Sequence, residues 1–344
     1  MAEHRRHQGR TPRHRGRGRP SGAAPDGGAV AAEPGRLLAT AAEHWPADCG
    51  IVAGVSRNRC LVLLGGQAVS CALAPELRHQ GLSLAVGDRV ALEASGSESR
   101  VTAILPRRSE LVRQREDRSR RLAAGQGRQV LAANVDLAVV VAAKRKPPFH
   151  PRLLDRYLVM CRAGGVDPLI CLNKADLPGP DPDLGLYEGL GVPSVLASAA
   201  TGLGLQELRQ HLRGRTGVLV GHSGVGKSSL LNALLGEEAA VVGELGREGR
   251  RGRHTTTASS LHDLGEGSWL IDSPGIRSWG LSEIDRESLR DYFPEFAELA
   301  PACRYRDCNH TVEPDCAVLA AVEAGEIPRA RYDSYRRLYE EAES

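Results

Sequence analysis

The hydrophobic positions follow one pattern in the first third of the chain. From about residue 48 to residue 105, short apolar runs alternate with polar positions and are separated by turns; the runs are GIVAGVS, RCLVLLGG, AVSCALA, VGDRVALEA and SRVTAILP. A period of two predicts strands. Five short strands in so small a segment favour a closed barrel of the OB type, which we assign to residues 41–108. Such barrels often bind oligonucleotides, but the fold alone does not establish that function.

The pattern changes after a basic stretch, RRSELVRQREDRSRRLAAGQGRQ, which we interpret as a linker. Buried strands are predicted at VDLAVVVAA, DPLICLNKAD and VPSVLASA, and helices at HPRLLDRYLVMCRAGG and GLQELRQHLRG. This alternation predicts a parallel sheet covered on both faces, an α/β domain over residues 116–280. Beyond it, residues 281–344 are predicted to form a mostly helical C-terminal domain.

The stretch VLVGHSGVGKSSLLNALLG combines a strand, a glycine-rich turn and a helix, with the spacing of a phosphate-binding loop. The glycines let backbone N–H groups surround phosphates, and the positive end of the helix faces them. Lys227 would reach the outer phosphates, and the Ser228 hydroxyl would ligate magnesium. The alternative, a glycine-rich turn with an unrelated lysine, is disfavoured by the flanking strand and helix. The predicted contacts are Gly221, His222, Ser223, Gly224, Val225, Gly226, Lys227, Ser228 and Ser229.

Two further segments belong to the phosphate side. DSPG follows the predicted strand SWLI, so that Asp272 would hold magnesium through water and the Gly275 N–H would sense the γ-phosphate. Between it and the phosphate loop lies GREGRRGRHTTTAS, a polar loop that can order around γ-phosphate and magnesium. Thr255 and Thr256 are the candidate magnesium ligands in this loop, and Thr256 is favoured. A merely flexible loop is the alternative.

The motif NKAD, at the end of a buried strand, predicts which base is bound. Asp176 can accept two hydrogen bonds from the ring N–H and amino group of guanine, which adenine cannot supply. Asn173 would brace the loop, the Lys174 stem would lie over the base, and the Ala199 N–H suits the guanine oxygen. The predicted contacts on this side are Asn173, Lys174, Ala175, Asp176, Ser198 and Ala199.

The motifs run in the order NKAD, SA, phosphate loop, threonine loop and DSPG, which is a rotation of the usual GTPase order. A sheet survives such a rotation when the original termini lie close together. The chain is therefore predicted to be a circularly permuted GTPase. Because the segment after Asp272 leads directly into the C-terminal domain, a nucleotide-driven shift would reach that domain through the chain itself.

The C-terminal segment CRYRDCNHTVEPDC has the ligands for a structural zinc ion. The thiolates of Cys303, Cys308 and Cys316 and the imidazole of His310 complete a tetrahedral site with no open position. The alternative is three reduced cysteines and a surface histidine, but this polar segment needs a staple to hold its shape. The remaining cysteines are interpreted as buried thiols; they are Cys49, Cys60, Cys71, Cys161 and Cys171.

Composition adds a basic arm and argues against membrane and secreted classes. The 344 residues are 41% hydrophobic and 25% charged, as in ordinary globular proteins. The longest apolar run, LAVVVAA, is far too short to span a membrane, and no secretory signal is apparent, so we expect a cytoplasmic protein. Residues 1–40 are rich in Arg, Gly and Pro, which predicts a disordered arm suited to nucleic acid, or else a solvated tail without a partner.

The assembly of a barrel, a permuted GTPase and a Cys-x4-Cys-x-His-x5-Cys segment resembles the RsgA (YjeQ) family, the ribosome small subunit-dependent GTPase A. The resemblance runs from about residue 48 to the C-terminus and rests on AANVD, NKAD, GHSGVGKSSLLNALL, GRHTTT, DSPG and EPDC, but not on the basic arm. It implies a slow GTPase that uses GTP, Mg²⁺ and one Zn²⁺. It also implies binding to the small ribosomal subunit and its rRNA in late maturation, stimulation by that subunit, and release gated by the GTP state. We expect a monomer without a membrane partner.

The residue after DSPG bears on mechanism, because Ile276 stands where many GTPases carry a water-orienting glutamine. His254, within the family's RHTTT, is the candidate to place the water, and with Lys227 it completes the candidate catalytic pair. A loop histidine beside arginines could equally contact RNA. Two other functions stay open: a GTP-gated RNA-binding module in which hydrolysis merely resets the state, and a permuted GTPase acting on tRNA or the large subunit.

Overall fold

The computed structural model describes residues 45–46, 48–56, 59–79, 83–95, 98–114, 128–236, 259–273 and 284–342. All of them belong to the unit Glu33–Ser344. The predicted N-terminal arm lies outside the described residues, as do the predicted site residues His254, Thr255, Thr256 and Gly275.

The first five strands form a closed barrel, as the alternating pattern predicts. They are β1 Gly50–Val55, β2 Arg59–Leu64, β3 Gln67–Leu73, β4 Arg89–Ser95 and β5 Glu98–Ile104. They pair in the order β1-β2-β3-β5-β4, and β4 pairs back to β1. The side chains of Val52, Cys60 and Val101 are fully buried in the barrel core. The five-residue helix α1 Pro75–His79 precedes β4 and is too short to show a helical period in the sequence.

The basic stretch after the barrel is not a linker throughout, so that interpretation is wrong at its two ends. Strand β6 Glu110–Gln114 pairs antiparallel with β7 Arg128–Ala133. Leu111 and Val112 of β6 are both buried, at 0% and 7% exposure. Two apolar residues among many charged ones are too weak a pattern to predict a strand.

The central domain contains the parallel sheet that the alternating strands and helices predict. Its order is β10-β9-β8-β11-β13-β12, and only β12 runs antiparallel to its neighbour. The strands are β8 Leu137–Ala143, β9 Asp167–Asn173, β10 Ser194–Leu196, β11 Thr216–Val220, β12 Ser260–Gly265 and β13 Ser268–Asp272. The helices are α2 Pro151–Ala163, α3 Gly185–Gly189, α4 Leu205–Leu212 and α5 Lys227–Leu235.

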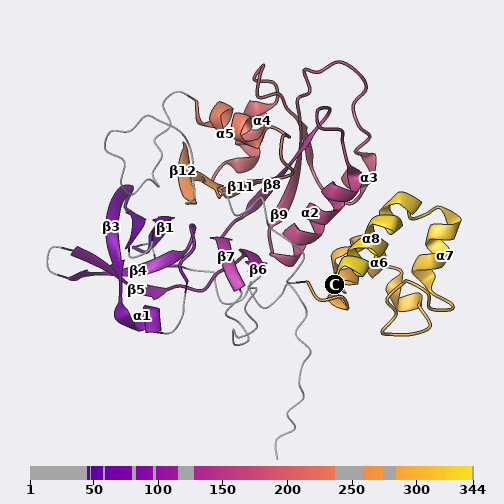
Figure 1. The fold of residues 1–344 in the computed structure, drawn as a ribbon, viewed down its shortest axis with the longest axis horizontal. Helices are drawn as coiled ribbons and strands as arrows, with labels where there is room; N and C mark the ends of the chain where they lie inside the picture. Colours follow the sequence, from indigo (N-terminus) through magenta and orange to yellow (C-terminus); the bar gives the residue numbers. More distant parts are fainter. Residues whose placement is uncertain are drawn as a thin grey trace, which may run out of the picture. The chain divides into compact units, whose positions relative to one another are not determined.

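Helices cover both faces of this sheet (Figure 1). Successive residues of β8 belong to different cores, because strand side chains alternate between faces. Val139 and Val141 pack with α4 and α5, whereas Ala138 and Val140 pack with α2. Because these strands run parallel, their carboxyl ends lie at one edge of the sheet, where the predicted motifs lie.

The C-terminal domain is helical, as predicted. Its elements are two short 3₁₀ helices, Ser288–Tyr292 and Ala300–Ala302, and the helices α6 Pro294–Ala297, α7 Ala317–Ala324 and α8 Arg329–Glu341. Phe293 and Phe296 stack at 5.2 Å between ring centroids, and Tyr335 meets both rings edge-on. Helix α8 packs beside α2 of the central domain (Figure 1). Within the described part of the chain, no helix has the length and apolar character required to cross a bilayer.

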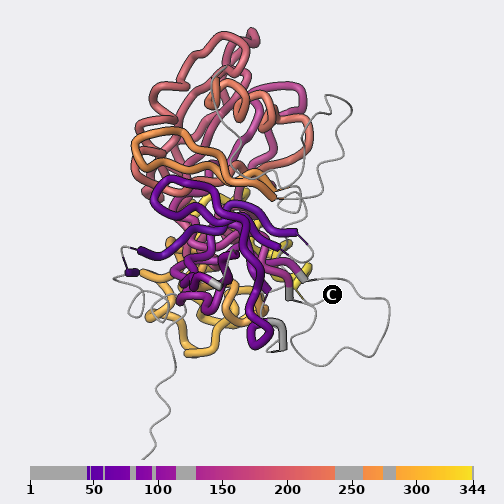
Figure 2. The backbone as a smooth tube through the Cα atoms, turned by 90° about the vertical axis from the view of Figure 1, so that its left-hand side faces the viewer, coloured from indigo at the N-terminus to yellow at the C-terminus, as the bar shows by residue number. Residues whose placement is uncertain are grey.

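The segment AANVD lies where the barrel meets the central sheet. Gly54 of β1 pairs with Ser260 of β12, so the indigo barrel strands lie beside the orange β12–β13 pair (Figure 2). The Asn134 side chain accepts a hydrogen bond from the Arg108 N–H at 2.9 Å and donates one to the Gly87 carbonyl at 3.0 Å. One amide group thus ties the segment before β8 to the end of the barrel.

Candidate functional site

The phosphate loop joins the end of β11 to the start of α5 and lines a pocket. The pocket brings together Gly221, Lys227, Ser228 and Asp272; its other lining residues are Leu219, Leu231, Ile271 and Ser273. The Lys227 amine lies over its own loop and donates to the carbonyls of Gly221 and His222, each at 2.7 Å. The structure therefore places the predicted lysine, serine and aspartate of the phosphate side around one hollow.

Asn173 connects the two sides of the candidate site. Its side chain is buried at the end of β9, donates from Nδ2 to the Val225 carbonyl at 2.8 Å and accepts at Oδ1 from the Ala199 N–H at 3.3 Å. Gly226 makes this approach possible, because a Cβ at that position would lie 2.4 Å from Asn173 Nδ2 and the backbone has φ +98°. The NKAD, SA and phosphate loops are thus joined through one amide.

Asp176 has its carboxylate fixed by the neighbouring strand end. The Ser198 hydroxyl donates to Asp176 Oδ1 at 2.6 Å and itself accepts from the Thr201 N–H at 3.2 Å. Ser198 is predicted as a nucleotide contact, and in the structure its hydroxyl orients the Asp176 carboxylate. Lys174 donates from Nζ to the Gly224 carbonyl at 2.7 Å, which places its stem along the edge between the NKAD loop and the phosphate loop.

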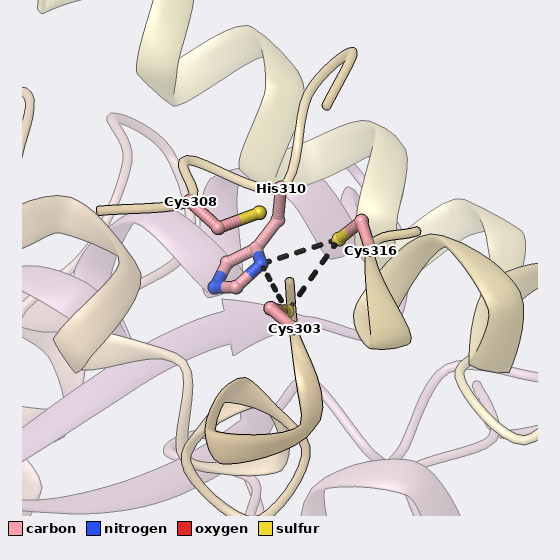
Figure 3. A group of neighbouring side chains, drawn as sticks. All are labelled: Cys303, Cys308, His310 and Cys316. Carbon is pink, nitrogen blue, oxygen red and sulfur yellow. Dashed lines mark hydrogen bonds between the residues drawn. The ribbon is translucent and has the colours of Figure 1, made fainter. Parts of the chain in front are cut away.

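The four predicted zinc ligands gather at one point (Figure 3). His310 Nδ1 lies 3.6 Å from Cys303 Sγ and 3.4 Å from Cys316 Sγ, and the two sulfurs are 3.9 Å apart. Together with Cys308 Sγ, all four ligand atoms lie within 4.8 Å of one another. A tetrahedral zinc ion places such atoms about 3.5 to 3.8 Å apart. The cluster therefore fits one zinc ion.

The chemistry of these side chains also suits a metal. Burial raises the pKa of the Cys308 thiol to about 12 and raises that of Cys316. Burial and the nearby Arg290 lower the pKa of His310 below its usual value, so the imidazole is neutral and able to ligate at pH 7. Thiols buried together are costly to ionise without a cation, and a zinc ion removes that cost.

Side chains that the sequence analysis did not single out hold the zinc loop. Glu313 accepts hydrogen bonds from the N–H groups of Asn309, Thr311 and Val312 at 2.8 to 3.0 Å. Burial opposes ionisation of Glu313, but these backbone N–H groups outweigh it and lower the pKa to about 2. Tyr332 donates from its hydroxyl to the His310 carbonyl at 2.8 Å. Of the other cysteines, four are buried as expected and Cys49 is half-buried.

Comparison with known proteins gives the family. The RsgA GTPase family matches residues 104–282. The small ribosomal subunit biogenesis GTPase RsgA of Chlorobaculum tepidum is 42% identical over 301 residues, covering 84% of this chain and 96% of the relative. The protein of the same name from Pseudomonas putida is 44% identical over 280 residues, covering 79% of this chain and 78% of the relative.

Two solved structures have the same architecture. YjeQ from Thermotoga maritima superposes with a TM-score of 0.67 at 31% identity, covering 86% of this chain and 98% of that one. YloQ, described as a circularly permuted GTPase, superposes with a TM-score of 0.65 at 29% identity, covering 88% and 96%. These likenesses confirm the predicted rotation of the GTPase motifs. The chain belongs to the RsgA family of circularly permuted GTPases.

Proposed function

We propose that this chain is a GTPase that binds the small ribosomal subunit and hydrolyses GTP late in the maturation of that subunit. One observation carries the nucleotide part of the proposal: Asn173 joins the phosphate loop to the guanine-reading loops, so that both ends of one nucleotide would meet prepared groups. The names of the relatives support the ribosomal part.

On the phosphate side, Lys227 would leave the carbonyls of Gly221 and His222 and neutralise charge on the outer phosphates. Ser228, Thr256 and Asp272 would hold Mg²⁺, which would supply positive charge to the phosphates when bound. The Gly275 N–H would contact the γ-phosphate. Hydrolysis then requires a group that orients water, and we assign this role to His254 because Ile276 cannot fill it.

On the base side, Asp176 would accept hydrogen bonds from the ring N–H and the 2-amino group of guanine. The Ser198 hydroxyl holds this carboxylate at 2.6 Å, so its orientation does not have to be set when the nucleotide binds. Adenine would leave the carboxylate without donors, at a cost of about 1–3 kcal/mol or more. The site therefore favours guanine nucleotides over adenine nucleotides.

The zinc centre would have a structural role. Cys303, Cys308, His310 and Cys316 would fill all four positions around the ion and leave none for a substrate. We propose that the ion keeps the C-terminal domain in the shape that contacts the ribosomal subunit. The basic arm would add positive charge for rRNA. We further propose that the protein is a cytoplasmic monomer. Its rate of GTP hydrolysis would be low and would be raised by the small ribosomal subunit.

Co-sedimentation with separated ribosomal subunits tests the partner. We expect the protein to pellet with small subunits in the presence of a non-hydrolysable GTP analogue and to stay in the supernatant with GDP. Pelleting with large subunits instead, or binding to tRNA, would contradict the proposal and favour a permuted GTPase that acts on another RNA. Equal pelleting with both nucleotides would contradict the gating by GTP.

A further inference from the structure

Lys144, Arg145 and Lys146 directly follow β8, and each contacts either NKAD or the loop after it. Lys144 donates from Nζ to Asp181 Oδ1 at 2.7 Å, and the lysine side chain is only 7% exposed although the aspartate is 49% exposed. The Lys144 N–H also donates to the Asn173 carbonyl at 2.9 Å. Lys144 therefore contacts both Asn173, at the start of the guanine-reading loop, and Asp181, eight residues further along the chain.

Arg145 contacts the same loop at its glycine. Gly179 has φ +110°, and a Cβ there would lie 1.9 Å from the Arg145 guanidinium. The guanidinium thus lies beside Gly179, in the space that a side chain would take. A group that fills this space limits how far the loop can move toward the end of β8.

Lys146 contributes through its backbone and not through its side chain. Its carbonyl accepts a hydrogen bond from Lys174 Nζ, which also donates to the Gly224 carbonyl of the phosphate loop. The Lys146 side chain itself is exposed. Lys144 thus contacts the loop through an ion pair and Arg145 through packing, whereas the Lys146 carbonyl contacts Lys174 of NKAD itself.

We infer that Lys144 and Arg145 are positioning residues for guanine recognition. Residues 177–183, LPGPDPD, contain no helix or strand, so their backbone is held by contacts with other segments. Asp176 directly precedes this stretch: Ser198 orients its carboxylate, and Lys144 and Arg145, which we call the clamp, hold the chain that follows it. The inference deepens the proposed function and rests on it, because it assumes that Asp176 reads guanine.

The clamp can be tested by its effect on base preference in the full-length protein. IDP lacks the 2-amino group, so the ratio of the Kd values for IDP and GDP reports the placement of the Asp176 carboxylate. We expect Lys144→Met to raise the Kd for GDP about tenfold, because the charge-assisted hydrogen bond between Lys144 and Asp181 is lost. The Kd for IDP should rise only about threefold, because IDP has no 2-amino group for Asp176 to bind. Turnover at saturating GTP should stay within about twofold, because the phosphate side is untouched.

Matched variants separate the clamp from general damage. Lys146→Met removes a neighbouring lysine side chain but keeps its carbonyl, so both Kd values should match those of the wild type. Asp181→Asn weakens the ion pair from its exposed end and should shift the base preference in the same direction. This variant provides the test if Lys144→Met does not fold. Arg145→Ala should also shift the base preference in that direction.

The outcomes distinguish a failure of the proposed guanine site from a failure of the clamp alone. If Asp176→Asn keeps the preference for GDP, the proposed guanine site itself is wrong. If Asp176→Asn loses that preference while Lys144→Met and Asp181→Asn keep it, only the clamp is wrong. Equal increases in the Kd values for GDP and IDP would show a merely structural lysine and would also overturn the inference.

Discussion

Arg331 of α8 lies with its guanidinium buried between two carboxylates from other elements. It donates to Asp155 of α2 at 2.5 Å and to Glu295 of α6 at 2.6 Å, and its side chain is 1% exposed. The guanidinium also lies 4.3 Å from the centre of the Phe293 ring. Replacing it with methionine fills most of the volume but leaves Asp155, which is 3% exposed, as a buried charge.

The expected loss of folding free energy is large because the remaining carboxylates, Asp155 and Glu295, are poorly accessible to solvent. Breaking a buried ion pair by removing one partner costs about 3–5 kcal/mol. Asp155 keeps one hydrogen bond, from the Tyr187 hydroxyl at 3.1 Å, and Glu295 is 13% exposed and can gain water. We therefore expect Arg331→Met to lower the free energy of unfolding by about 4 kcal/mol, near the middle of that range.

Urea unfolding followed by circular dichroism measures this loss. Arg329→Met is the matched control, because Arg329 lies on the same helix, is 74% exposed and pairs with Asp333 at i,i+4. It should change the free energy of unfolding by less than about 0.5 kcal/mol. The double variant Asp155→Asn/Arg331→Met should be more stable than Arg331→Met alone, since it strands one charge fewer. A loss below about 1 kcal/mol for Arg331→Met would refute the reasoning.

Three further predictions concern the nucleotide and zinc sites. Gly226→Ala should weaken GDP binding at least about a hundredfold, because its Cβ would strike the NKAD asparagine, whereas Gly214→Ala, with φ +68° and open space around it, should leave GDP binding unchanged in the same titration. Zinc binding near pH 7 should release at least about two protons, because burial keeps Cys308 and Cys316 protonated without the metal, so affinity rises with pH; calorimetry in buffers of different ionisation enthalpy measures this, and release of less than one proton would contradict it. His254→Ala should reduce subunit-stimulated turnover and spare GTP affinity; unchanged turnover would end that assignment.

The sequence predicts the parts of the fold that repeat a local pattern. The barrel strands alternate, and the strands of the central sheet are continuous apolar runs, so both could be recognised from neighbouring residues. Strand β12 was not predicted, because its buried and exposed positions follow no clear period and it includes the buried polar His262. Helices α1 and α3 have five residues each, too few for a helical period to show.

Only local patterns can be recognised from the sequence, and this explains why the motif residues were predicted and the residues that support them were not. The phosphate loop, NKAD and the zinc ligands are visible because their spacing within a short segment reflects the chemistry. Arg331 and Asp155 are 176 residues apart, and nothing local to either indicates the other. Lys144 could not be singled out from the sequence either, because a lysine directly after a strand is typical of a solvated charge. Its role depends on the contact with Asp181 in a distant loop.

GTP turnover by the full-length protein, measured alone and with isolated small or large ribosomal subunits, is the decisive test of hydrolysis stimulated by the small subunit. We expect slow turnover alone, strong stimulation by the small subunit only, and no stimulated turnover of ATP. A rate of GTP hydrolysis that neither subunit changes would leave a GTPase of this family but contradict hydrolysis driven by the small subunit.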